Sequence, residues 1–375
     1  MPTSLLRQIR DEGVSPWLDG VTRDELRSGA FRALIDDLGV SGVTTNPTLF
    51  AKSLAGAASA YAGSIHDLAA RGVGPEEAAR LLAAEDAREA CDVLAAVHQE
   101  SDGYDGWVSL EVDPRFADDA EATLAEVRAL TWLVDRPNLM IKIPATSAGV
   151  SAMTAATAEG HNINATLIFS VERYLEVLAA YALGLERVLE AGRGIADIRS
   201  VASLFVSRVD AALAALDPRD VELRTSGTVP PGLANARSAY RAFSETMGTA
   251  TWAELFAAGA NPQRLLWAST GVKDPALDPS TYVMGLAIPG TISTMPPETL
   301  AAAAQAPARP QAAGSAGDAT DENRALRVLD EVKDELMASL LADGVGQFQK
   351  SWRVVLAIVE ERLSAARSDR SSSAR

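Results

Sequence analysis

Short apolar runs alternate with longer amphipathic stretches along most of this chain, and each run ends on polar residues. We predict a β-strand from each run, at 15–19, 42–46, 107–111, 139–142, 163–169, 201–206, 264–269 and 282–288. Helical spacing of apolar residues lies between these strands, at 23–38, 75–100, 117–133, 147–159, 171–191, 209–216 and 234–248. Strands that alternate with helices are typical of a parallel sheet. Eight such units in roughly 300 residues predict an α/β fold, a single (β/α)8 TIM barrel.

A doubly wound open sheet is the alternative fold for this pattern. It is disfavoured because no Gly-x-Gly-x-x-Gly sequence follows the first strand. Residues 47–105 are too many for one crossover helix. We therefore expect several extra helices after the second strand, in an excursion over the barrel mouth.

The C-terminal part of the chain departs from the repeating pattern. Residues 301–320 are rich in Ala, Pro, Gln and Gly, which indicates the end of a helix followed by a loop. Two further helices are predicted at 321–341 and 345–366, because apolar residues recur there at helical spacing. We predict one domain over residues 1–365, with these helices packed on the barrel, and a disordered tail at 366–375.

Composition narrows the range of functions. The formal net charge of −16 repels nucleic acid and anionic lipid, so neither is expected as a partner. The first residues lack the apolar core of a signal peptide, and no stretch approaches the roughly 18 apolar residues of a membrane span. Together with a single cysteine, Cys91, these features predict a cytoplasmic protein without internal disulfide bonds.

Metal-binding residue patterns are weak in this sequence. Its three histidines, His66, His98 and His161, are too scattered for a histidine-based metal site. No acidic cluster has the spacing of a magnesium site. We therefore expect chemistry without a metal or another cofactor, which makes a lysine the leading catalytic candidate.

Lys142 is the most unusual residue of the chain, because it interrupts the apolar run LMIKIP at 139–144. The chain has 34 basic residues, and only five of them are lysines. Burial lowers the pKa of a lysine from about 10.4 toward neutrality. A neutral amine can attack a ketone and form a Schiff base, which an arginine cannot do. The alternative is that a lysine at a strand end extends its charge to solvent.

Polar side chains at the ends of the predicted strands form a chemically coherent set. In chain order they are Asp19, Asn46, Glu111, Lys142, Asn164, Thr166, Ser203 and Ser269. The C-terminal ends of barrel strands converge on one face, where catalytic groups lie. Taken singly, each residue has a structural alternative: Asp19 could cap a helix, and Glu111 could pair with an arginine. As a set they favour a catalytic site.

This set suits lysine chemistry. Glu111, on the strand next to Lys142, could transfer the proton that dehydrates a carbinolamine, with a water held by Thr166. The resulting iminium is an electron sink, so Asp19 could deprotonate a substrate hydroxyl while a carbon–carbon bond breaks. Sugar hydroxyl groups need several fixed hydrogen-bond partners. The candidates for that role are Asn46, Asn164 and Ser203.

Five ordered segments resemble the transaldolase family. GVTTNPT at 42–48 is similar to the first family signature, and MIKIPAT at 140–146 resembles the segment that carries the Schiff-base lysine. NATLIFS at 164–170, SLFVSRVD at 203–210 and QRLLWAS at 263–269 match three further family segments. The similarity extends from about residue 10 to about residue 365, and its style resembles the longer subfamily found in actinobacteria.

The resemblance implies a transferase of the non-oxidative pentose phosphate pathway. Such an enzyme moves a dihydroxyacetone unit from sedoheptulose 7-phosphate or fructose 6-phosphate to glyceraldehyde 3-phosphate or erythrose 4-phosphate. By motif position, Lys142 is implied as the Schiff-base nucleophile and Asp19 as the acid–base at the cleaved bond. Glu111 and Thr166 are implied in the water and proton steps. The implied substrate-binding residues are Asn46, Asn164, Ser203, the phosphate-binding Arg208, and Ser269.

Two further positions are predicted to contact substrate. Shorter family members carry a second phosphate arginine two positions after the serine that matches Ser269, where this chain has Gly271. We predict that Lys273, the nearest basic residue, serves the phosphate as a point charge instead. Phe205 either shields the reactive enamine from water or belongs to the core.

Two other functions stay open at this point. A class I sugar-phosphate aldolase, a lyase, would use the same lysine but release the three-carbon unit to water. A non-catalytic phosphosugar-binding barrel would use the site for binding alone, although Lys142, Glu111 and Asp19 together argue against it. We expect phosphorylated ketoses and aldoses as ligands and either a monomer or a homodimer.

Overall fold

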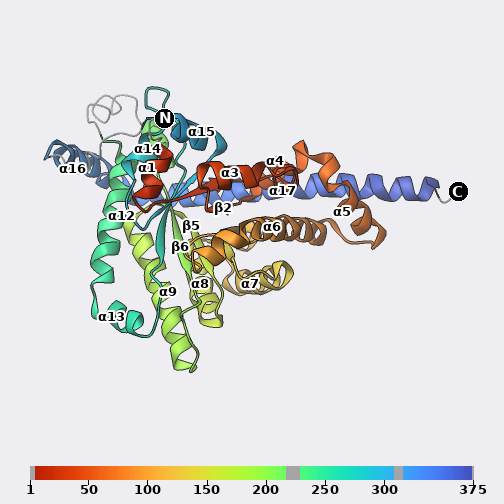
Figure 1. Ribbon diagram of the computed structural model, residues 1–375, viewed down its shortest axis with the longest axis horizontal. Helices are drawn as coiled ribbons and strands as arrows, with labels where there is room; N and C mark the ends of the chain where they lie inside the picture. Colours follow the sequence, from red (N-terminus) through yellow and green to blue (C-terminus); the bar gives the residue numbers. More distant parts are fainter. Residues whose placement is uncertain (1–4, 217–228, 308–315, 374–375) are drawn as a thin grey trace.

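Eight parallel strands form a closed barrel with helices packed around it (Figure 1). The computed structural model describes residues 5–216, 229–307 and 316–373. Each strand pairs in parallel with the next, and the eighth pairs with the first. The α/β class and the single (β/α)8 barrel predicted from the sequence are therefore confirmed. The strands are β1 (Ser15–Asp19), β2 (Gly42–Thr44), β3 (Trp107–Glu111), β4 (Leu139–Pro144), β5 (Ile163–Ile168), β6 (Ser200–Phe205), β7 (Arg264–Ala268) and β8 (Ile292–Met295).

The eighth strand does not lie where the apolar pattern predicts it. The run at 282–288 falls mostly in a short helix, α14 (Thr281–Gly285), and β8 closes the barrel after it. The Tyr282 hydroxyl donates a hydrogen bond of 2.6 Å to Asp210 Oδ2 on α10 (Ser207–Leu216), which holds this run among the surrounding helices. A short apolar run suits a strand or a buried helical turn equally, so the predicted strand at 282–288 is wrong.

The other predicted elements are present with small shifts at their ends. α6 (Pro75–Glu100) and α8 (Ser147–Glu159) have the predicted limits. The predicted helix at 23–38 is divided into α2 (Arg23–Ser28) and α3 (Ala30–Leu38) by Gly29, whose φ of 86° favours glycine. Further helices around the barrel are α1 (Leu5–Asp11), η1 (Pro114–Phe116), α7 (Ala120–Val134), α9 (Val171–Glu190), α12 (Pro231–Met247), α13 (Ala250–Ala257) and α15 (Pro297–Gln305).

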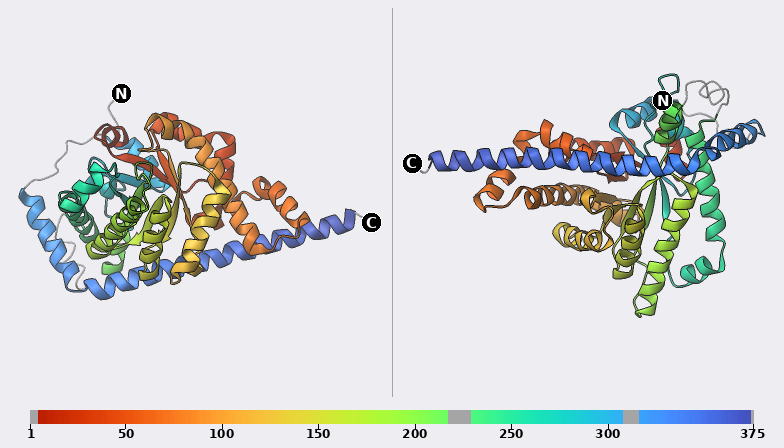
Figure 2. Two further views of the ribbon diagram at one scale, coloured as in Figure 1. Left: turned by 90° about the horizontal axis from the view of Figure 1, so that it is seen from below. Right: turned by 180° about the vertical axis from the view of Figure 1, so that it is seen from behind.

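Three helices take the place of a single crossover between β2 and β3, as predicted. α4 (Pro47–Gly56), α5 (Ala58–Ala70) and α6 pack with the C-terminal helix α17 (Lys333–Ser373) in a hydrophobic cluster separate from the barrel core. Figure 2 shows α17 running beside the barrel and on past it toward α5, so that its C-terminal end projects. This cluster anchors α17 against the helices that follow β2.

The C-terminal helices differ from the prediction in their boundaries. α16 (Ala316–Asp330) begins before residue 321, and α17 begins at Lys333, so the helices meet at 331–332 instead of 342–344. Gly344 lies inside α17, where an added Cβ would come within 2.9 Å of Leu167 Cδ2 on β5. This glycine therefore permits close packing and does not end a helix.

The predicted disordered tail at 366–375 also differs from the structure. α17 continues as a helix to Ser373, and residues 374–375 lie outside the described part of the chain. The helix extends this far because each added residue continues a helix whose preceding turns are already formed. The assignment of residues 1–365 to one domain stays a prediction.

Inward-facing side chains alternate along the strands and fill the barrel below its mouth. Trp17 on β1 faces Gly42 on β2, where a Cβ would lie within 2.4 Å of the indole ring. Trp17 and Met140 belong to the same hydrophobic cluster. Since side chains alternate with period two, Asp19 and Lys142 follow these residues on the same face, at the top of the barrel.

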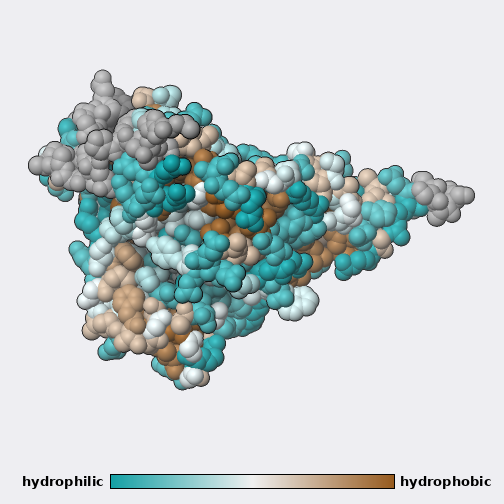
Figure 3. Space-filling model, in the orientation of Figure 1, coloured by the Kyte–Doolittle hydropathy of each residue, from teal (hydrophilic) through white to brown (hydrophobic). Residues whose placement is uncertain are grey.

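The molecular surface is mostly hydrophilic on the face seen in Figure 3, as the charge of −16 suggests. Apolar areas are scattered over the same face (Figure 3). Leu189 on α9 and Phe256 on α13 are among the exposed large apolar residues. Among the described helices, none is long and apolar enough to cross a membrane.

Candidate active site

The C-terminal ends of the strands surround a cavity of about 540 Å³, a size that suits a small-molecule ligand. Helices α4 and α17 contribute to its walls. Most of the site residues predicted from the sequence line it, namely Asp19, Asn46, Lys142, Ser203, Phe205, Arg208, Ser269 and Lys273. The remaining three, Glu111, Asn164 and Thr166, are buried on β3 and β5. The structure thus gathers residues from seven strand ends and their following turns.

Lys142 is buried, and its amine has two partners. β3 and β4 pair with Glu111 directly opposite Lys142, and Lys142 Nζ lies 3.0 Å from Glu111 Oε2. Nζ also donates a hydrogen bond of 3.1 Å to the carbonyl oxygen of Thr45, in the turn after β2. Only 3% of Lys142 is exposed, so the alternative of a lysine that extends its charge to solvent is wrong.

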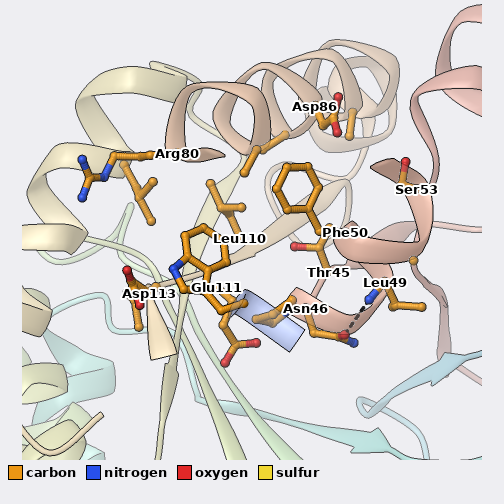
Figure 4. A pocket seen from close by; sticks show the side chains of 18 of the residues that line it. Thr45, Asn46, Leu49, Phe50, Ser53, Arg80, Asp86, Leu110, Glu111 and Asp113 are labelled. Atoms are coloured by element: carbon orange, nitrogen blue, oxygen red, sulfur yellow. Dashed lines mark hydrogen bonds between the residues drawn. The ribbon is translucent and has the colours of Figure 1, made fainter. Parts of the chain in front are cut away.

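Glu111 is poised to exchange protons near neutral pH. Burial raises the pKa of Glu111 to about 7, because the carboxylate loses its hydration, while the positive charge of Lys142 opposes that effect. Glu111 Oε1 accepts no hydrogen bond from any described residue. Figure 4 shows Glu111 and Asn46 among the side chains that line a second, smaller cavity, which extends between α4 and α6. A carboxyl group with a pKa near the working pH can act as both acid and base.

Thr166 lies at an irregularity of β5. The register of β5 against β6 shifts between Ala165 and Ile168, and Leu167 has a φ of 58°. A residue other than glycine rarely adopts this conformation, and such bulges often direct a side chain near an active site. The Thr166 hydroxyl is fully buried and has no hydrogen-bond partner within the described part of the chain.

Asp19 is held at the end of β1 by a chain of hydroxyl groups. Asp19 Oδ1 accepts a hydrogen bond of 2.9 Å from Thr44 Oγ1, which lies 2.8 Å from Thr294 Oγ1 on β8. Loss of hydration raises the pKa of Asp19 above its usual value, while the charges of Lys142 and Arg208 and the Thr44 hydrogen bond lower it. The carboxylate is therefore oriented through one oxygen, and the charges of two cations act on it.

The three hydroxyl-binding candidates are fixed by local hydrogen bonds. Ser203 Oγ donates to Asn164 Oδ1 at 2.7 Å, and Asn164 Nδ2 donates to Ser109 Oγ at 2.9 Å. Asn46 caps α4, because its Oδ1 accepts a hydrogen bond of 3.0 Å from the backbone nitrogen of Leu49 (Figure 4). The cap uses the oxygen of Asn46, so its amide nitrogen is the group that a substrate oxygen can contact.

Cationic and hydroxyl groups also line the cavity. Arg208, in the first turn of α10, lies 5.2 Å from the centre of the Phe205 ring, and burial lowers its pKa while Asp19 opposes this. Ser269 adopts a φ of 55° and its hydroxyl is 2.9 Å from Ser207 Oγ. Lys273 is exposed at the rim. Such a group of an arginine, hydroxyls and a helix N-terminus suits an anion.

Several cavity residues were not predicted from the sequence, among them three on α4 and α17. Gln347 and Phe348 come from α17, and Lys52 comes from α4. The Phe348 ring centre is 5.8 Å from Lys142 Nζ. Phe348 carries no sequence signal beyond helical apolar spacing, because its position over the barrel depends on how α17 packs. Among the described residues, no group of three or more His, Cys, Asp and Glu side chains is arranged to hold a metal ion.

Comparison with known proteins agrees with these observations. The sequence profile of the family Transaldolase/Fructose-6-phosphate aldolase matches residues 16–359. The chain is 50% identical to the transaldolase of Thermobifida fusca over 96% of its own length and 99% of that protein. It is 46% identical to the transaldolase of Acidothermus cellulolyticus, covering 98% and 99% of the two chains. It is 45% identical to transaldolase 1 of Streptomyces coelicolor, covering 96% and 95%. The chain therefore belongs to the transaldolase/fructose-6-phosphate aldolase family.

Proposed function

We propose that this protein is a cytoplasmic transaldolase of the non-oxidative pentose phosphate pathway. It transfers a dihydroxyacetone unit from fructose 6-phosphate or sedoheptulose 7-phosphate to an aldose phosphate, through a Schiff base on Lys142. The observation that carries this proposal is the buried contact of 3.0 Å between Lys142 Nζ and Glu111 Oε2, with Lys142 lining the same cavity as Asp19 and Arg208. Neither nucleic acid nor a membrane is needed as a partner.

Schiff-base formation begins with the pair of Lys142 and Glu111. The Glu111 carboxylate takes a proton from the ammonium group of Lys142, and the free amine adds to the ketone carbon of the donor. Glu111 then returns its proton to the carbinolamine hydroxyl, which leaves as water. Thr166, whose hydroxyl has no partner among the described residues, is suited to bind that water.

Cleavage of the donor requires a base at the hydroxyl of the fourth carbon. Asp19 accepts that proton, the bond between the third and fourth carbons breaks, and its electrons pass into the iminium to give an enamine. The released aldose phosphate leaves, and the enamine carbon attacks the aldehyde of the acceptor. The new oxygen anion takes the proton back from Asp19, and hydrolysis of the iminium restores Lys142.

Substrate binding divides between two groups of residues. We propose that Asn46, Asn164 and Ser203 hold the hydroxyl groups of the three-carbon unit, and that Arg208, Ser269 and Lys273 hold the phosphate. Asn164 is oriented by Ser203 and Ser109, so it needs little reorganisation when substrate binds. The acidic charge of the whole chain makes these local cations necessary for an anionic ligand.

A coupled assay for glyceraldehyde 3-phosphate tests this function. Fructose 6-phosphate is supplied with and without erythrose 4-phosphate. Steady release that requires erythrose 4-phosphate is expected, because the enamine waits for an acceptor. Equal steady release without the acceptor would identify a lyase instead. If neither release nor a trapped adduct is observed, a non-catalytic phosphosugar-binding protein would remain.

The pH dependence should follow the titration of Glu111. Because the Glu111 carboxylate must accept the proton of Lys142, and its pKa is about 7, kcat/KM should fall about tenfold per pH unit below about pH 7. The measurement is kcat/KM for fructose 6-phosphate from pH 5.5 to pH 9. Glu111→Gln should be much slower and lose the acidic limb. If kcat/KM of this variant still decreases below about pH 7, another group is responsible for the titration.

The phosphate site should be visible in the salt dependence of the reaction. Increasing ionic strength screens Arg208 and Lys273, so KM for fructose 6-phosphate should rise while kcat changes little. Arg208→Gln should raise KM about tenfold or more and weaken this salt effect; Lys273→Met should do the same to a smaller extent. Unphosphorylated fructose is the control donor, because it carries no phosphate. If KM is independent of ionic strength for both donors, neither residue binds the phosphate.

A further inference from the structure

Phe348 covers the reactive amine from the side of α17. The centre of its ring lies 5.8 Å from Lys142 Nζ, within the range at which a cation interacts with an aromatic face. Phe348 is 3% exposed and lines the same cavity as Lys142 and Asp19. Its position over the nitrogen that becomes the Schiff base is therefore built into the fold.

We propose that Phe348 determines the outcome of the reaction, by keeping water from the Lys142 enamine so that the three-carbon unit is transferred and not released. This inference rests on the function proposed above. Phe205, on β6, lies on another wall of the cavity and packs at 5.3 Å against Phe169. Phe348 closes the site from α17, and the position of this helix over the barrel could not be predicted from the sequence.

Three contacts hold α17 in position around Phe348. One turn earlier, Gly344 lies against the Leu167 side chain on β5, where an added Cβ would come within 2.9 Å of Leu167 Cδ2. Immediately after it, Gln349 Nε2 donates a hydrogen bond of 3.2 Å to the carbonyl oxygen of Pro114, at the start of η1. Three residues after Phe348, the Ser351 hydroxyl lies 2.8 Å from the Thr48 hydroxyl on α4. The helix is thus fixed to segments that follow or include β2, β3 and β5.

The competing reaction shows what the ring has to prevent. When the enamine carbon takes a proton from water, the hydroxide that remains is neutralised by the proton held on Asp19, and an iminium results. One further water adds to this iminium, and free dihydroxyacetone leaves with restoration of the Lys142 amine. The net change is hydrolytic release of the unit that an acceptor would otherwise receive. A dry ring beside the enamine limits access of the first water, which protonates the enamine carbon; transfer does not include this step, whereas both reactions need the second water to hydrolyse the iminium.

The ring also interacts with charge. The iminium is a cation centred on the position of Lys142 Nζ, and an aromatic face stabilises a cation, most of all where water is excluded. An aliphatic side chain of similar size excludes water but lacks this attraction. The two roles of Phe348 can therefore be separated by substitution.

Phe348→Ala and Phe348→Leu are the informative variants. The quantity to measure is the ratio of free dihydroxyacetone to transferred product, with fructose 6-phosphate and erythrose 4-phosphate as substrates. Phe348→Ala should raise this ratio about tenfold or more, because water gains access. Phe348→Leu should keep the ratio within about twofold of the unmodified enzyme, since it fills similar volume. Phe348→Leu should still lower the amount of borohydride-trapped adduct, by about two- to thirtyfold.

The control variant is Val359→Ala. Val359 is buried on the same helix, in the cluster that α17 forms with α4, α5 and α6. The substitution weakens the packing of α17 at a distance from the site, so it should leave the ratio unchanged. Thermal unfolding identifies a variant that fails to fold, and Phe348→Val then replaces Phe348→Ala, because its shorter side chain should also admit water and raise the ratio.

Two results would overturn the proposal. One is a ratio in Phe348→Ala equal to that of the unmodified enzyme. The other is a ratio in Val359→Ala as high as that in Phe348→Ala. Failure of the underlying function looks different, because the unmodified protein would then show neither transfer nor a trapped adduct. If the unmodified protein transfers the unit normally and Phe348→Ala has the same ratio, only the inference about Phe348 is refuted.

Discussion

Replacing Lys142 by arginine is expected to abolish transfer activity and the borohydride-trapped adduct together. Arginine keeps a positive charge near Glu111 but cannot form a Schiff base. The loss in kcat should be on the order of 10⁴-fold or more, as for nucleophiles of other enzymes with covalent intermediates. The measurements are the coupled transfer assay and the protein mass after incubation with fructose 6-phosphate and borohydride.

Two further variants complete the Lys142 experiment. Lys142→Met removes the charge as well and should be equally inactive, which shows that the arginine variant does not fail through crowding alone. Lys350→Arg replaces an exposed lysine on α17 and should retain full activity and the trapped adduct. An adduct that survives in both Lys142 variants would place the nucleophile on another lysine.

Asp19→Asn is expected to separate Schiff-base formation from bond cleavage. The amide keeps the size of the carboxylate and can retain the contact with Thr44 Oγ1, but it cannot accept the proton of the substrate hydroxyl. Turnover should fall about 10²- to 10⁴-fold, the usual contribution of a general base. The adduct trapped with fructose 6-phosphate should still form, and its mass should be that of the uncleaved six-carbon donor.

The intact donor in the adduct is the decisive observation for Asp19. If the trapped species carries only three carbons, cleavage proceeds without Asp19 and another base must act. If no adduct forms, Asp19 is needed earlier, in the attack by Lys142. Asp37→Asn, at an exposed position of α3, is the matched control and should behave like the unmodified enzyme.

Most of the candidate site residues were predictable because they lie at strand ends. Lys142 stands out because a charge within an apolar run is costly unless it has a partner. The polar residues after each run meet because closure of a parallel barrel brings every C-terminal strand end to one face. Asp19, Asn46 and Ser203 are thus placed by period and topology alone, and the structure shows them around one cavity.

The errors have a common physical origin. The run at 282–288 is apolar because it is buried, and burial alone does not distinguish a strand from a helical turn packed on the barrel. The helix boundary expected before Val345 failed because Gly344 serves close contact with Leu167 on β5. Both features depend on partners distant in the sequence, which local patterns do not contain.

The sequence by itself determined the barrel, the face that carries the site and the residue types available for lysine chemistry, since these follow from the order and period of the chain. Tertiary structure alone decided which groups touch and in what environment. It set the pairing of Lys142 with Glu111 and the desolvation that raises the pKa of Glu111 to about 7. It also brought Phe348 over the amine, because the packing of α17 on β5, η1 and α4 requires contacts between segments that only the folded chain brings together.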